Sequence, residues 1–105
     1  MQAIHFQVKS KLGVKIRVTT SYWNFIIESK HPIMKDKETL VKTTLKSPDL
    51  IKKSTKDRSV FLYYKSYKKN FAVVVCKHLN GSGYIITTYI TDRIKIGEQI
   101  WKKPR

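Results

Sequence analysis

Three runs of strand-forming residues, separated by short turns, constrain the fold of this chain more than any other feature. The runs are residues 58–65, 71–78 and 83–90, and all three are rich in Val, Ile, Phe and Tyr. β-Branched and aromatic side chains favour strands. The separators, residues 66–70 and 80–83, have the length and the residue types of hairpin turns. The second half of the chain is therefore predicted to form an antiparallel meander.

The beginning of the chain predicts a further hairpin. Residues 3–8 and 14–18 alternate apolar and polar side chains with a period of two, which is typical of half-buried strands. A turn around Gly13 separates the two segments.

Two helices are predicted between this hairpin and the meander. The first runs from about residue 22 to 30, with Thr20 or Ser21 as its cap, and the second from about 37 to 46, with Asp36 as its cap. A proline follows each segment and ends the helix there.

These elements together predict one α+β domain over residues 1–105, with helices packed on one sheet face and the other face available for a ligand. Residues 50–51 are strand-like, and the tail over 91–101 is expected to be a short helix or an extended arm.

The charge points to a polyanionic partner. The chain has 22 Lys+Arg against 7 Asp+Glu, a formal net charge of +15. Nucleic acid is the first expectation, an acidic protein and an anionic membrane surface the others. Tyrosines stand among the lysines at residues 63–69, which favours single-stranded RNA, because aromatic faces stack on exposed bases. The lysines expected to bind RNA are Lys52, Lys53, Lys56, Lys65, Lys68, Lys69 and Lys77.

Cysteine content and hydropathy favour a cytoplasmic protein that does not enter a membrane. Cys76 is the single cysteine, so no internal disulfide can form. The longest apolar run, residues 71–76, is far shorter than the roughly 20 residues of a membrane helix. The start of the chain lacks the apolar block of a secretion signal.

Several short motifs follow one another along residues 13–101. The motifs are Gly13-Val14-Lys15-Ile16-Arg17-Val18-Thr19, Tyr22-Trp23, Lys30-His31-Pro32, Ser47-Pro48-Asp49, Asp57-Arg58 and Thr87-Thr88-Tyr89. Their order and spacing resemble a phage- and plasmid-associated branch of the BECR nucleases, the superfamily that groups barnase, EndoU, the colicin-type tRNases and RelE-like toxins.

This resemblance implies two N-terminal helices packed on one face of a four-stranded antiparallel sheet, with the hairpin before them. It also implies a toxin-type endoribonuclease that needs no metal or other cofactor. The family's functional positions fall on His31, Arg58 and Thr87, with Tyr64 and Tyr89 in support.

Such an enzyme uses the neighbouring 2′-OH of RNA as nucleophile and leaves a 2′,3′-cyclic phosphate. Histidine suits the proton transfers, because its unperturbed pKa of about 6.5 lies near working pH. Arg58 could stabilise the charge that develops on the phosphate. Thr87 and Tyr89 share one strand face, from which their hydroxyls could position the phosphate. Acidic residues are few and scattered, which disfavours a two-metal site.

The expected partners are RNA, with tRNA and ribosome-associated mRNA as candidate forms, and an acidic antitoxin or immunity protein. Two alternatives remain: a non-catalytic RNA-binding protein, and a protein-binding module with an apolar patch around Trp101. His5 and His78 are expected to be structural or solvated. Cys76, in an apolar strand, is expected to be a buried hydrophobic residue and not a nucleophile.

Overall fold

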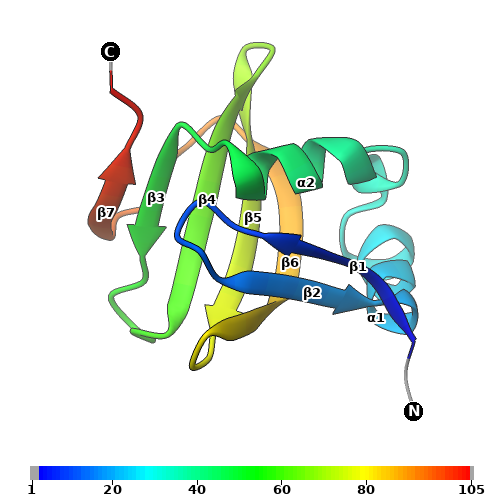
Figure 1. The fold of residues 1–105 in the computed structure, drawn as a ribbon. Coiled ribbons are helices and arrows are strands. Elements are labelled where there is room, and N and C mark those ends of the chain that lie inside the picture. The colour runs from blue at the N-terminus through cyan, green and yellow to red at the C-terminus, as the bar shows by residue number, and fades with distance from the viewer. Residues whose placement is uncertain (1–2, 105) are drawn as a thin grey trace.

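The computed structural model describes residues 3–104, whose strands form one mixed sheet (Figure 1). The strands follow the order β1-β2-β6-β5-β4-β3-β7 across this sheet. Their bounds are β1 Ile4–Lys9, β2 Lys15–Thr19, β3 Leu50–Lys53, β4 Val60–Tyr67, β5 Asn70–His78, β6 Ser82–Thr91 and β7 Glu98–Lys102. The three predicted strands of the meander are present as β4, β5 and β6, and the predicted hairpin as β1 and β2.

One strand pair is parallel and joins the hairpin to the meander. Residues 15–17 of β2 pair with residues 82–84 of β6, and every other neighbouring pair is antiparallel. Gly83 lies in this short contact. Gly83 also pairs with His78 of β5, and a Cβ atom at Gly83 would stand 2.3 Å from the carbonyl oxygen of Lys77, so the approach of the β6 backbone to β5 requires glycine.

The helical region lies between β2 and β3. Helix α1 (Thr20–Phe25) continues into the π-helical turn η1 (Ile26–Lys30), and the 3-10 turn η2 (Pro32–Met34) leads to α2 (Glu38–Lys46). His31 separates η1 from η2, and the helix ends before Pro32 as predicted.

Both predicted helix caps differ from the structure. Thr19, not Thr20 or Ser21, caps α1, and its hydroxyl accepts the Tyr22 N–H at 3.2 Å. Asp36 makes no capping bond to α2, which starts after Lys37 without a side-chain cap.

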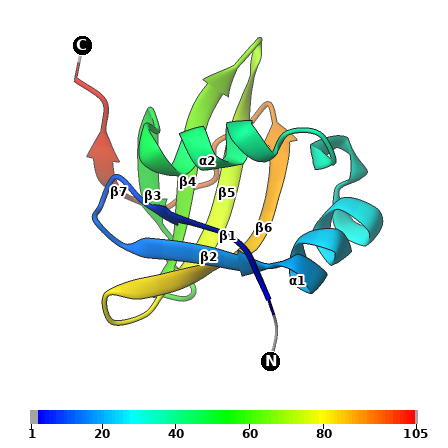
Figure 2. The ribbon, with the colours of Figure 1, turned by 45° about the vertical axis from the view of Figure 1, so that its right-hand side comes forward.

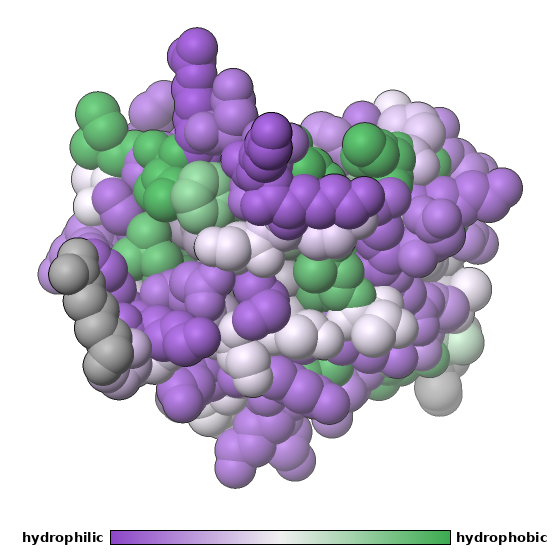
Figure 3. Space-filling view, turned by 90° about the horizontal axis from the view of Figure 1, so that it is seen from above, coloured by the Kyte–Doolittle hydropathy of each residue, from purple (hydrophilic) through white to green (hydrophobic). Residues whose placement is uncertain are grey.

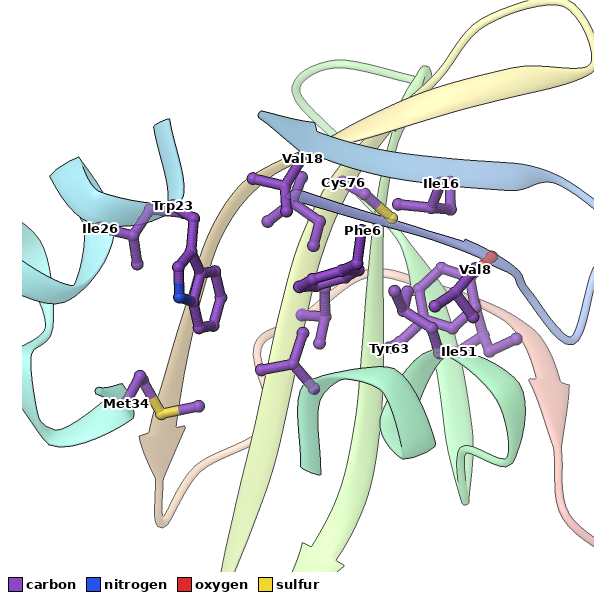
Figure 4. Close-up of a cluster of buried hydrophobic side chains, with 14 residues drawn as sticks. Phe6, Val8, Ile16, Val18, Trp23, Ile26, Met34, Ile51, Tyr63 and Cys76 are labelled. Atoms are coloured by element: carbon purple, nitrogen blue, oxygen red, sulfur yellow. The ribbon is translucent and has the colours of Figure 1, made fainter. Parts of the chain in front are cut away.

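The main core lies between α2, the β1–β2 hairpin and one face of the sheet. Helix α2 contacts β5, β4 and β1, and Figures 1 and 2 show it lying across this face with the hairpin beside it. The buried members of this core are Phe6, Val8, Ile16, Val18, Trp23, Ile26, Met34, Val41, Leu45, Ile51, Tyr63, Val74, Cys76 and Ile85 (Figure 4). Burying one large apolar side chain of this kind stabilises the fold by about 1.5–3 kcal/mol.

The opposite face of the sheet has a smaller apolar cluster, centred on Leu62, Tyr64 and Val73. The connection between β6 and β7 crosses this face, behind the sheet in Figure 1, and the backbone N–H of Lys95 donates to the Tyr64 hydroxyl at 3.1 Å. No helix among residues 3–104 has the length and apolar character to span a bilayer.

The expected fold of two helices on a four-stranded antiparallel sheet is wrong. The sheet has seven strands and is mixed, and both α-helices are short. The edges of a three-stranded meander carry unpaired N–H and C=O groups, and these groups accept any strand that reaches them. The hairpin pairs with the β6 edge through β2, and β3 pairs with the β4 edge. The tail becomes β7 and pairs with β3.

Candidate functional site

The face of the sheet turned away from α2, which we call the open face, brings most of the predicted catalytic residues together. Strand register places its side chains in three adjacent rows. The first row is Arg17, Tyr84, Lys77 and Val60, the second is Thr87, Val75 and Leu62, and the third is Tyr89, Val73 and Tyr64. Thr87 therefore lies between the basic first row and the tyrosines of the third row.

His31 reaches the open face from the end of η1. Its backbone N–H donates to the carbonyl of Ile26 at 2.7 Å, and the next residue is Pro32. The hydrogen bond and the proline ring together restrict the backbone at His31. The ring lies against Tyr89, with 5.3 Å between the ring centroids. Partial burial, together with the charge of Lys30, lowers the pKa of His31 below its usual value. The ring is therefore largely neutral at pH 7 and can accept a proton.

Tyr64 and Tyr89 occupy one row, on either side of Val73. Burial raises the pKa of both phenols, so they keep their protons at neutral pH. Tyr64 is 1% exposed, and its hydroxyl accepts a hydrogen bond from the backbone N–H of Lys95. Tyr89 is therefore the tyrosine of this row that a ligand can reach more easily.

Thr87 carries a buried hydroxyl whose oxygen has no hydrogen-bond partner among the described residues. Leaving a buried hydroxyl unpaired costs about 1–3 kcal/mol, and native proteins rarely tolerate it without a reason. A ligand oxygen or amide that entered between the rows would remove this cost.

Arg58 is not part of this cluster. It lies in the turn between β3 and β4, where its guanidinium forms an ion pair with Glu98. Strands rise about 3.3 Å per residue, so Val60 and Tyr64 alone are about 13 Å apart and Arg58 lies farther away. The predicted convergence of Arg58 with His31 and Thr87 is absent from the structure.

The seven predicted RNA-binding lysines are spread over both sheet faces and both ends of the meander. Lys77 and Lys52 are on the open face, whereas Lys53 lies over the Phe61 ring on the other face. Lys65 also points to that face and donates to the carbonyl of Ser47 at 2.9 Å. The remaining three are in exposed turns: Lys56, Lys68 and Lys69. Figure 3, which looks down on the β4–β5 turn, shows hydrophilic side chains over most of the surface in view.

A pocket of about 550 Å³ opens beside the first row of the open face. The residues that line it are Arg17, Val18, Thr19, Tyr22, Asp57, Val60, Lys77, Tyr84, Ile85 and Ile86. Sequence reasoning proposed only Lys77 among these as a ligand-binding residue. The available signal was the alternation in residues 14–18, which separates Arg17 from the apolar face of its strand.

The side chains of His78 and Cys76 make packing contacts inside the protein. The His78 ring stacks on Phe61 with 3.8 Å between centroids, and its Nε2 is 3.1 Å from the Tyr63 hydroxyl. Burial, with a contribution from Lys53, lowers the pKa of His78 to about 4. Cys76 is fully buried, and burial raises the pKa of its thiol, so it is a poor nucleophile.

His5 lies in β1, where its ring is hydrogen-bonded to Glu38 and stacks on Trp23. It is thus tied to the α2 side of the molecule, away from the open face.

Trp101, around which an apolar patch was expected, is half-buried against the core, and Lys11 lies over its ring at 5.1 Å. Exposed isoleucines occur nearby at positions 94, 96 and 100. Among residues 3–104, no three His, Cys, Asp or Glu side chains are grouped so as to hold a metal ion.

Comparisons with protein-family models, curated proteins and solved structures found no match for this chain. The resemblance to BECR nucleases therefore rests on the sequence motifs alone, and the functional argument depends on the geometry of the open face.

Proposed function

We propose that this protein is a metal-independent endoribonuclease of the toxin type, with its active site on the open face. The observation that carries the proposal is the contact between His31 and Tyr89 beside the Thr87 hydroxyl, which has no hydrogen-bond partner within residues 3–104. Metal-free RNA cleavage needs a base, an acid and a hydrogen-bond donor, and the imidazole, the phenol and the hydroxyl can fill these three roles.

In the proposed reaction, His31 removes the proton from the 2′-OH of the RNA. The 2′-oxygen bonds to the adjacent phosphorus, and the bond from phosphorus to the 5′-oxygen breaks. Tyr89 gives its proton to the leaving 5′-oxygen, and the imidazolium of His31 then returns a proton to the phenolate. The products are a 2′,3′-cyclic phosphate and a 5′-hydroxyl. The Thr87 hydroxyl donates to a phosphate oxygen while charge develops there.

The charge of the protein supports RNA as the substrate. A net charge of +15 attracts a polyanion over a long range, and it gives the protein affinity for the backbone of any RNA. A cytoplasmic enzyme of this kind needs an inhibitor, and carboxylates that imitate phosphates would block a basic face best. We therefore assign it an acidic antitoxin or immunity protein as partner.

A non-catalytic RNA-binding protein is the second candidate. The position of Arg58 favours it, because Arg58 is paired with Glu98 away from His31 and does not stabilise the charge of a transition state there. This candidate predicts the same affinity for RNA without cleavage.

The deciding experiment incubates the purified protein with a single-stranded RNA in EDTA and analyses the fragment ends. We expect fragments with cyclic phosphate ends. His31→Ala should lower the rate by about 10²–10⁴, the usual contribution of general acid–base catalysis. The matched control is His5→Ala, which removes a histidine on the other side of the molecule and should cleave at the parental rate. Failure of the parent protein to cleave, or equal rates for His31→Ala and the parent, would reject the activity.

A further inference from the structure

The first row of the open face combines cations with an accessible aromatic ring. Arg17 on β2 and Lys77 on β5 are both register partners of Tyr84 on β6, so the tyrosine stands between the two cations. Neighbouring strands are about 4.8 Å apart, which puts the two cationic residues about 10 Å from each other at the backbone. Tyr84 is 39% exposed and lines the pocket, so its side chain is accessible to a ligand.

The two cations are held in place but keep bonding capacity. One guanidinium nitrogen of Arg17 donates to the carbonyl of Gly83 at 3.2 Å, which leaves its other donors free for a ligand. Lys77 forms an ion pair with Asp57 at 3.3 Å. Both side chains of this pair are more than a third exposed, and such surface pairs are weak, so a phosphate can take the place of the carboxylate.

The rest of the pocket suits a flat, partly apolar group. Val60 and Ile86 are apolar, and the Tyr22 hydroxyl is already committed to the carbonyl of Ile86 at 2.7 Å. The volume of about 550 Å³ is in the usual range for small-molecule sites. Cations beside an exposed aromatic ring form the arrangement with which proteins bind single-stranded nucleic acid.

Asp57 adds a fixed acceptor at the rim of the pocket. The side chain and the backbone N–H of Ser59 bond to one of its oxygens, and with Lys77 they lower its pKa to about 2. Its other oxygen faces Lys77 and is ready to accept from a ligand once that lysine binds a phosphate.

We propose that this pocket binds one unstacked nucleotide of single-stranded RNA, with its base on Tyr84 and its phosphates on Arg17 and Lys77. This inference rests on the proposed action on RNA and names a part of the strand that is held outside the reacting nucleotide. Lys77 and Val73 are four residues apart on β5, so the pocket is about 13 Å from the row that holds Tyr89. The bound nucleotide is therefore not the one that is cleaved but one farther along the same strand.

The test measures binding of a fluorescent hexaadenylate RNA by anisotropy in EDTA, with His31→Ala in every protein to prevent cleavage. Tyr84→Ala should raise Kd by about 5- to 150-fold, the usual loss when a stacked base loses its ring. Tyr84→Phe keeps the ring and should bind the RNA as tightly as the background protein, which carries His31→Ala alone. Lys77→Ala should reduce the slope of log K against log salt by about 0.7, the contribution of one phosphate on a single strand.

Tyr67→Ala is the matched control, because this tyrosine stands among lysines at the far end of β4. It should leave Kd near the background value, and circular dichroism should show all variants folded. The pocket assignment is overturned if Tyr84→Ala binds the RNA as the background does, or if Tyr67→Ala weakens binding equally.

A labelled hexaglutamate peptide separates the nucleotide from a carboxylate partner. Loss of peptide binding in Tyr84→Ala with unchanged RNA binding would assign the pocket to an acidic protein and overturn the proposal. The outcomes also separate the pocket from the proposed enzyme. If the parent protein does not cleave RNA, and Tyr84→Ala nevertheless loses RNA binding, the pocket assignment is supported and the proposed activity is rejected. If RNA is cleaved but Tyr84→Ala binds as the background does, the pocket alone fails.

Discussion

The partly buried ring of His78 should make the stability of this protein depend on pH between about pH 6.5 and pH 4. The pKa of His78 is about 4 in the folded protein, against about 6.5 for an unperturbed histidine, because its ring is packed against Phe61 and lies near Lys53. Between these two values the unfolded chain binds more protons than the folded one. Stability is therefore present above pH 6.5, falls as the pH falls toward 4, and does not change further below 4 through this group.

The magnitude follows from the two pKa values. At pH 5 the full linkage would remove about 2 kcal/mol relative to pH 7.5. The ring is partly accessible, so we expect a loss of about 1–2 kcal/mol. Asp57 does not contribute here, because its pKa of about 2 lies below this window. His31 adds a loss of the same sign, since its pKa is also lowered.

The assay is urea unfolding at pH 7.5 and pH 5 for the parent and for His78→Gln. With an m-value of about 1–2 kcal/mol/M, the parent's midpoint should fall by roughly 1 M, and the variant's by clearly less. Leu79→Ala is the control, because this neighbour is 46% exposed and should keep the parental pH dependence. Equal pH dependence in His78→Gln and the parent would refute the assignment of the effect to this ring.

Two further predictions concern Gly83 of β6 and the toxicity of the protein. Gly83→Ala should lower Tm by several degrees or prevent folding, because the added Cβ would stand 2.3 Å from the Lys77 carbonyl oxygen. In Gly81→Ala the Cβ meets no atom within 4 Å, so this variant should be destabilised only by the backbone strain of its φ of +81°, about 1–2 kcal/mol, and a thermal melt compares the two. Expression of the parent chain alone should arrest cells, and expression of His31→Ala should not; growth curves measure this, and equal growth would contradict the toxin assignment.

Local pattern was sufficient for the elements of the fold but not for their assembly. The alternation in residues 3–8 and 14–18, and the β-rich runs that became β4, β5 and β6, depend only on neighbours in the chain, so they were readable from the sequence. Strand pairing is different, because any unpaired edge offers the same N–H and C=O groups. The parallel contact of β2 with β6 and the docking of β7 on β3 were therefore not predictable from these patterns.

The candidate site divides in the same way. The sequence alone determined the charge of +15, the supply of histidine, threonine and tyrosine, and the shared strand face of Thr87 and Tyr89. Only the tertiary structure placed His31 against Tyr89 and separated Arg58 from both.

The row of Arg17, Tyr84 and Lys77 arises from the pairing of β2, β6 and β5, which are distant in the chain. Its relation to Thr87 also depends on the irregularity in β6 between Ile85 and Thr87, which shifts the register against β5. Side-chain alternation is a property of one strand, whereas register is set by packing between strands, and this is why the tertiary structure decided the site.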